Sequence, residues 1–243
     1  MRLFALAAFA FTQAMQLYFI AFIQNWTPRG IDGGAPQHWL PALAIDLGLL
    51  AAFGFAHSLM ARPAFKRWWL GLVPKALERV IYGLVSALLL LLICLFWSPL
   101  PQTVWVVDSP VGKALLYGAL AIGGGLILWS IWCVDLLHFT GLRQAFGQQV
   151  ESPFALRGPY RWVRHPIQSG LMLVLWSTPV LSIGHALLAT VLTAYSVLAT
   201  LLLEERDLDR ELGDAYRRYR ADVPAFVPRL FGGAAPEHSE RVQ

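Results

Sequence analysis

The residues best suited to chemistry lie in a polar segment over 158–170, where an apolar run is about to begin. A charged side chain inside a bilayer costs about 3 kcal/mol or more, so such residues usually have partners or a function. His165 is followed by Pro166, and proline is favoured in the first turn of a helix. A helix N-terminus offers unpaired N–H groups to an anion, and Arg164 adds a guanidinium that binds carboxylates in a bidentate manner. Gly170, one turn later, allows a close approach to the backbone. The segment predicts an anion-binding site at the start of a membrane helix.

Two carboxylates, Glu204 and Glu205, follow the last apolar run. The simplest explanation is that a helix leaving the bilayer needs charge at the interface. However, Glu204 shares a helical face with Leu208 and Leu212, so we expect it to be buried and paired with a cation. The cationic candidates in the first segment are Arg161, Arg164 and His165.

Two histidines, His57 and His138, stand at the ends of the second and fourth apolar runs. Histidine can act as a base near neutral pH, although an interfacial hydrogen bond is the alternative role for each. The sequence contains no His-Glu-x-x-His, P-loop or Cys-x-x-Cys motif, which argues against a metalloprotease, an ATPase or a zinc site. Cys94 and Cys133 lie inside apolar runs and are interpreted as packed thiols. We therefore expect no metal.

The composition is that of a polytopic membrane protein. Of 243 residues, 57% are hydrophobic and 14% are charged, whereas soluble domains have about 25% charged residues. The net charge of +4 comes from basic residues in short loops, which orient a membrane protein and contact anionic lipid. We expect membrane lipid as a partner, and no nucleic acid.

The apolar runs predict an all-α bundle of about six membrane segments. They cover residues 3–23, 40–60, 80–97, 114–138, 167–183 and 185–203. A spanning helix needs roughly 17–25 residues, so each run can cross, the last two only just. The last two are expected to form a helical hairpin. Basic residues cluster after the second, fourth and sixth runs, which places both termini in the cytoplasm.

Three regions are expected along the chain. Residues 1–138 form a four-span membrane region, 139–229 form a region that carries both polar motifs, and 230–243 form a disordered tail. Within the second region, residues 204–219 predict a C-terminal cytoplasmic amphipathic helix that continues from the last span. The residues expected on its packed face are Glu204, Leu208, Leu212, Tyr216 and Tyr219. Pro224 and Pro228 should then turn the chain back.

The two polar motifs together resemble those of the integral-membrane methyltransferase superfamily, which includes isoprenylcysteine carboxyl methyltransferases and phospholipid N-methyltransferases. The motifs are Gly158-Pro159-Tyr160-Arg161-x-Val163-Arg164-His165-Pro166-x-x-x-Gly170 and Glu204-Glu205-x-x-Leu208-x-x-x-Leu212-Gly213-x-x-Tyr216-x-x-Tyr219. Upstream, His57-Ser58-x-Met60-Ala61-Arg62-Pro63 and Glu78-Arg79 with Tyr82 resemble the bacterial methanethiol S-methyltransferases. That second similarity runs over most of the chain.

The resemblance implies a catalytic region over 139–229 that binds S-adenosylmethionine at the cytosolic face of a bacterial inner membrane. The acceptor would be a small thiol, methanethiol, converted to dimethyl sulfide with release of S-adenosylhomocysteine. The residues assigned to the cofactor are Tyr160, Val163, Arg164, His165, Pro166, Gly170, Glu204, Glu205 and Tyr216. The thiol proton would leave to His57, His138 or Glu205, among which the sequence does not decide.

Two departures from the family pattern leave alternatives open. Many members have tyrosine where this chain has Gln168, and the stretch from Asp135 to Thr140 differs from the pattern of the thiol-methylating branch. A lipid-like acceptor, such as a prenylcysteine carboxylate or a phospholipid amine, is the main alternative. A non-catalytic membrane protein that keeps the fold is another, and the oligomeric state is left open.

Overall fold

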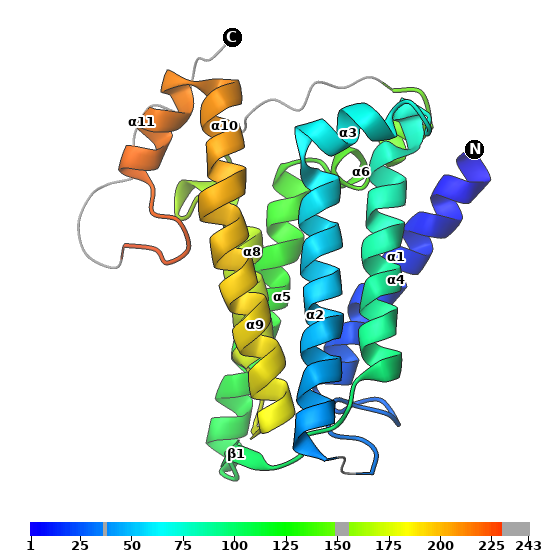
Figure 1. The fold of residues 1–243 in the computed structure, drawn as a ribbon. Helices are drawn as coiled ribbons and strands as arrows, with labels where there is room; N and C mark the ends of the chain where they lie inside the picture. The colour runs from blue at the N-terminus through cyan, green and yellow to red at the C-terminus, as the bar shows by residue number, and fades with distance from the viewer. Residues whose placement is uncertain (36–37, 149–155, 230–243) are drawn as a thin grey trace.

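A computed structural model describes residues 1–35, 38–148 and 156–229 as a bundle of long helices (Figure 1). The long elements are α1 (Arg2–Ile23), α2 (Trp39–Ala61), α4 (Glu78–Phe96), α5 (Pro110–Cys133) and α9 (Ile183–Ala199). α9 continues through a π-helical turn, η3 (Thr200–Glu204), into α10 (Glu205–Leu212). Within the described residues, five helices are long and apolar enough to cross a membrane. The predicted polytopic helix bundle is confirmed.

The expected fifth span is shorter than its apolar run suggests. α8 (Pro166–Trp176) has 11 residues, and at about 1.5 Å per residue it covers roughly half of a ~30 Å hydrocarbon layer. The chain then forms a short strand, β2 (Val180–Ser182), which pairs antiparallel with β1 (Thr103–Val106). The Ser182 side chain accepts a hydrogen bond from the backbone N–H of His185 and so starts α9. The hairpin of α8 and α9 is present, but α8 does not cross as a helix.

The short helices gather at one end of the bundle. They include α3 (Pro63–Trp69), η1 (Lys75–Leu77), α6 (Leu136–Phe139), α7 (Leu142–Ala145), η2 (Gly158–Arg161) and α11 (Asp214–Asp222). The N-terminus, α3, α6, α10 and α11 lie at this end, and β1 lies at the other (Figure 1). The polar segment before α8 and the C-terminal helices therefore share one end of the bundle, as the loop charges predicted.

The helices α5 and α8 touch through their backbones. A Cβ on Gly170 would lie 2.6 Å from the carbonyl oxygen of Gly123, and a Cβ on Gly123 would lie 2.7 Å from that of Gly170. Small residues let membrane helices approach closely and gain van der Waals contact. The close approach expected at Gly170 is therefore made by another helix. This packing fixes α8, which directly follows Arg164 and His165, against the long α5.

The C-terminal helix is interrupted. A single helix over 204–219 was expected, but Gly213 has φ 57° and separates α10 from α11. Positive φ is readily adopted by glycine, which has no Cβ. The expected face is still packed, because Tyr216, Tyr219 and Val223 form a small core with Leu208, Leu212 and Leu156. The chain leaves α11 before Pro224, as predicted, and the tail 230–243 lies outside the described residues.

Candidate functional site

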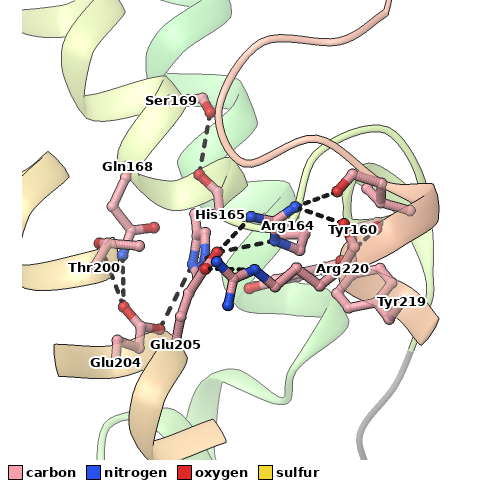
Figure 2. A network of polar contacts seen from close by, with 11 residues as sticks. Tyr160, Arg164, His165, Gln168, Ser169, Thr200, Glu204, Glu205, Tyr219 and Arg220 are labelled. Carbon is pink, nitrogen blue, oxygen red and sulfur yellow. Dashed lines mark hydrogen bonds and ion pairs between the residues drawn. The ribbon is translucent and has the colours of Figure 1, made fainter. Parts of the chain in front are cut away.

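A buried carboxylate, Glu205, is the centre of the polar site (Figure 2). Its side chain is 1% exposed. Arg164 donates from Nη2 and Nε to Glu205 Oε1 at 2.6 and 2.9 Å, and His165 Nε2 lies 3.0 Å from the same oxygen. Arg220 Nε lies 3.4 Å from Oε2. A buried charge is tolerated when it is paired and hydrogen-bonded in this way.

The prediction that Glu204 is buried is wrong, and the buried carboxylate is Glu205. Glu204 was expected to be buried, but its side chain is 46% exposed, whereas Glu205 is buried. The expectation followed the apolar face of the C-terminal helix alone, whereas Arg164 and His165 approach the helix on the side of Glu205. Arg161, another expected partner, is exposed at the end of η2.

Glu204 provides an accessible carboxylate beside this buried centre. Its Oε2 accepts hydrogen bonds from Gln168 Nε2 at 3.3 Å and from Thr200 Oγ1 at 3.5 Å, and its Oε1 lies 3.8 Å from His165 Nδ1. Burial, and then the negative charge of Glu204, raise the pKa of Tyr160 above its ordinary value. His165 therefore lies between two carboxylates, and the charge of Glu204 acts on Tyr160. Gln168, where many superfamily members have tyrosine, contributes an amide donor.

Arg164 makes hydrogen bonds to several segments of the chain. Besides Glu205, its Nη1 donates to the carbonyl oxygens of Arg220, at 3.2 Å, and Val223. Its backbone N–H donates to Pro224 O at 2.8 Å. The expected role of Arg164 was to clamp a cofactor carboxylate, but in the structure it joins the start of α8 to α10 and to the chain after α11.

The chain after α11 continues along the first turn of α8. The His165 backbone N–H donates to Ala225 O at 3.0 Å, and Ser169 Oγ donates to Phe226 O at 2.7 Å. The rings of His165 and Phe226 have centroids 5.7 Å apart. We call residues 223–226 the C-terminal strap. The strap takes up the backbone N–H group of His165, so this donor is not available to an anion.

The remaining cofactor candidates surround the buried centre. Val163 is 3% exposed and Pro166 occupies the first turn of α8, as predicted. Tyr216 is buried, and its hydroxyl lies beside Arg164 and Glu205. Burial, and then the charge of Glu205, raise the pKa of Tyr216 to about 12. Tyr219 donates from its hydroxyl to the carbonyl oxygen of Tyr160 at 2.7 Å. Their assignment to a cofactor remains a prediction.

The three expected proton acceptors lie in three different environments. Glu205 is held by Arg164, His165 and Arg220 as described above. His138 is buried in α6 beside Gln144, at 3.2 Å between Nδ1 and Nε2. Burial lowers the pKa of His138, and the positive charges of Arg79 and Arg143 act in the same direction.

His57 belongs to a third group, between α2 and α4. Its Nε2 is 2.7 Å from the Tyr82 hydroxyl and its Nδ1 is 3.0 Å from Ser86 Oγ. Its ring stacks on Phe53 with centroids 5.3 Å apart. Tyr82 and Ser86 stand four residues apart on α4 and so share a face. The spacing of four residues is a sequence signal that Tyr82 and Ser86 could both contact His57.

A salt bridge joins this third group to the buried centre. Arg62, at the end of α2, lies 3.0 Å from Asp207 in α10. One helical turn before Arg62, Ser58 is hydrogen-bonded to the hydroxyl of Tyr195 in α9 at 2.9 Å. Neither Asp207 nor Arg220 was among the expected site residues, although both lie in the charged stretch after the last apolar run. The group of His57 and the cluster of Glu205 are thus held on the same α2, α9 and α10 framework.

Comparison with known proteins identifies the family. A family model described as phospholipid methyltransferase matches residues 112–215. The chain is 40% identical over 239 residues to methanethiol S-methyltransferase 2 of Bradyrhizobium diazoefficiens, covering 94% of this chain and 90% of the relative. It is 38% identical to methanethiol S-methyltransferase of Crocosphaera subtropica, covering 87% and 85%. Nurim of Sus scrofa is 32% identical, covering 78% of this chain and 83% of nurim.

No solved structure matches the chain. The relatives named methanethiol S-methyltransferase extend over nearly the whole chain, including both polar motifs and the group around His57. The chain therefore belongs to the methanethiol S-methyltransferase family of membrane-embedded methyltransferases.

Proposed function

We propose that this protein transfers a methyl group from S-adenosylmethionine to a small thiol, methanethiol, and forms dimethyl sulfide and S-adenosylhomocysteine. The observation that carries the proposal is the exposed Glu204 carboxylate, which accepts a hydrogen bond from Gln168 in the first turn of α8, in the segment that matches the methyltransferase family. We further propose that this end of the bundle faces the cytoplasm, because the basic loops lie there.

The residues at this site fit the chemical groups of S-adenosylmethionine. Glu204 is an accessible anion that suits the ammonium or the ribose hydroxyls of the donor. The first turn of α8 begins with Pro166, and the N–H groups of a first turn have no partner within the helix, so those after Pro166 suit the carboxylate. When bound, S-adenosylmethionine supplies a methyl group already activated by a sulfonium. The protein then has to position the acceptor and exclude water.

The buried cluster has a positioning role in this scheme. Arg164 and Glu205 hold α8, α10 and the C-terminal strap together. They thereby fix the distance between Glu204 and the start of α8, which are the two parts of the donor site. Arg164 contributes to donor binding through this arrangement, in place of the direct clamp expected from the sequence.

The acceptor must be ionised, because the thiolate is the nucleophile. Of the three expected proton acceptors, the geometry favours His57. Glu205 is engaged by two arginines and a histidine, and His138 lies among Arg79, Arg143 and Asp135. His57 has no charged residue among its hydrogen-bond partners, which are Tyr82 and Ser86.

The direct test uses purified protein reconstituted in vesicles with S-adenosylmethionine and methanethiol. We expect dimethyl sulfide in the headspace and a strong loss of activity in the Glu204→Gln variant. No methyl transfer to any small thiol would contradict the proposal.

A phospholipid amine is the second candidate acceptor, because the matching family model is described as phospholipid methyltransferase. Methyl label from the donor should then appear in the extracted lipid of the same vesicles. Label in dimethyl sulfide with none in lipid would exclude this candidate.

A further inference from the structure

The hydrogen-bond directions around His57 follow from the contacts of its neighbours. Ser86 Oγ donates to the carbonyl oxygen of Tyr82, one turn earlier on α4, at 2.9 Å. A serine hydroxyl has one hydrogen to donate, so while Ser86 Oγ donates to Tyr82 O it accepts from His57 Nδ1 at 3.0 Å. Neutral His57 with its hydrogen on Nδ1 leaves a lone pair on Nε2. The Tyr82 hydroxyl, 2.7 Å away, therefore donates to Nε2.

This arrangement blocks direct proton transfer from a substrate to His57. Both ring nitrogens are engaged, and Phe53 stacks on the ring. The hydroxyl oxygen of Tyr82 has donated its hydrogen to His57 and keeps lone pairs that can accept another. Tyr82 is thus the member of the group that can accept a proton while passing its own proton to His57.

The charges of Glu204, Arg62 and Glu78 act on Tyr82, which links it electrostatically to the donor site, and Tyr195 of α9 is a further neighbour. The ring of Tyr195 packs on α2 where Gly54 has no side chain; a Cβ there would lie 3.2 Å from the Tyr195 ring. Phe53 provides apolar surface next to His57. A small apolar acceptor suits such surroundings.

We propose that Tyr82 is the catalytic residue that contacts the thiol. His57 accepts the proton that Tyr82 passes on, and Ser86 is the positioning residue that keeps the hydrogen of His57 on Nδ1. This assignment rests on the proposed thiol methyltransferase function and specifies its acceptor site. The ligand class is a small, neutral, apolar thiol.

Methyl transfer is coupled to the movement of one proton from the thiol to His57. The thiol proton moves to Tyr82 Oη while the Tyr82 proton moves to His57 Nε2, which leaves His57 protonated and Tyr82 neutral. The acceptor sulfur forms a bond to the methyl carbon as the bond from that carbon to the donor sulfonium breaks. The bonding electron pair stays on the donor sulfur, which becomes a neutral thioether. His57 then returns its proton through Tyr82 to solvent.

The test compares the Tyr82→Phe variant with the matched control Tyr195→Phe, which removes a hydroxyl bonded to Ser58 and not to His57. Two acceptors are used: methanethiol, which must lose a proton on the enzyme, and an aromatic thiol, which is already ionised at neutral pH. General base catalysis contributes about 100- to 10,000-fold. We expect Tyr82→Phe to lose at least about 100-fold in kcat with methanethiol and to keep the aromatic thiol within about threefold.

The outcomes of that test separate the two proposals. Equal loss on both acceptors, or no loss with methanethiol, overturns the assignment of Tyr82 while the transferase function stands. A wild-type protein that methylates neither thiol overturns the function and the assignment together. Donor binding by calorimetry should be unchanged in both variants, which shows that they fold.

A second readout does not depend on activity. Nitrogen-15 NMR of labelled histidine in the detergent-solubilised protein reports which ring nitrogen of His57 carries the hydrogen, with His57→Gln identifying the signal. We expect hydrogen on Nδ1 in the wild type, and a loss of this preference in Ser86→Ala. Hydrogen on Nε2 in the wild type would overturn the proposed hydrogen-bond directions and with them the role of Tyr82.

Discussion

The cluster around Glu205 and the group around His57 use polar residues in opposite ways. The cluster is charged and joins segments distant in sequence, since Arg164, Glu205 and Arg220 come from three different elements. The His57 group has no ion pair among its hydrogen-bond contacts and lies between two adjacent helices. Charged groups that are paired with one another stabilise the fold but do not readily carry a proton, whereas a chain of neutral hydrogen-bonded groups can transfer one. We therefore assign a structural role to the Glu205 cluster and proton transfer to the His57 group.

The largest expected effect comes from removing the buried cation. Arg164→Ala leaves Glu205 buried without its main partner, which costs about 3–5 kcal/mol in comparable buried pairs. We expect a large drop in the thermal unfolding temperature in detergent and no donor binding. The control is Arg161→Ala, three residues earlier and exposed. Equal unfolding temperatures for the two variants would show that the cluster does not hold the fold together.

The two adjacent glutamates should respond differently to the same change. Glu205→Gln removes a buried charge partner and should lower the unfolding temperature. Glu204→Gln should leave stability nearly unchanged and weaken donor binding, because a hydrogen bond to a charged group is worth about 1.5–3 kcal/mol, or roughly 10- to 100-fold in affinity. Isothermal calorimetry with S-adenosylmethionine measures this directly. Unchanged affinity in Glu204→Gln would remove Glu204 from the donor site.

A smaller effect is expected at the helix contact that supports the cluster. A methyl group on Gly170 would lie 2.6 Å from Gly123 O, so Gly170→Ala must push α8 away from α5. Overpacking of this kind costs about 1–3 kcal/mol. Gly124→Ala, on α5 with nothing within 4 Å of its new Cβ, should leave the unfolding temperature the same or raise it slightly. A lower unfolding temperature for Gly124→Ala than for Gly170→Ala would be incompatible with the close backbone contact.

The smallest effect is a pH dependence at His138, a histidine outside both regions. Burial lowers its pKa from 6.5, so the unfolded chain binds a proton more readily than the folded protein. This contribution to stability is complete above about pH 6.5 and decreases as the pH falls from there to the lower folded pKa. His138→Gln should flatten that part of the stability curve, measured as unfolding temperature against pH. An identical curve in the variant would contradict the buried, neutral state of His138.

The sequence predicts the bundle well because apolar runs of spanning length leave few alternatives in a bilayer. The helix start at His165-Pro166 and the meeting of the two polar motifs were also predictable, the latter from loop charges. The identity of the buried glutamate was not predictable, since it depends on the side of the helix that Arg164 and His165 approach. The length of α8 was overestimated because strand β2 is as apolar as the helix before it.

The separate roles of the residues in the site could not be predicted from the sequence either. Arg164 has the residue type of an anion clamp, but its contacts depend on the C-terminal strap, which folds back from beyond α11. Likewise, the place of Tyr82 between His57 and the donor site depends on the packing of α2 against α4. Long-range contacts of this kind are decided by tertiary structure and not by motif spacing.

The most direct measurement of the central claim is methyl transfer by the purified, reconstituted protein with S-adenosylmethionine that carries a deuterated methyl group, in the presence of methanethiol. We predict headspace dimethyl sulfide with one deuterated methyl group, formed by the wild type and by Tyr195→Phe but strongly reduced in Glu204→Gln and Tyr82→Phe. Deuterium found only in the vesicle lipid, or in no product at all, would contradict the account.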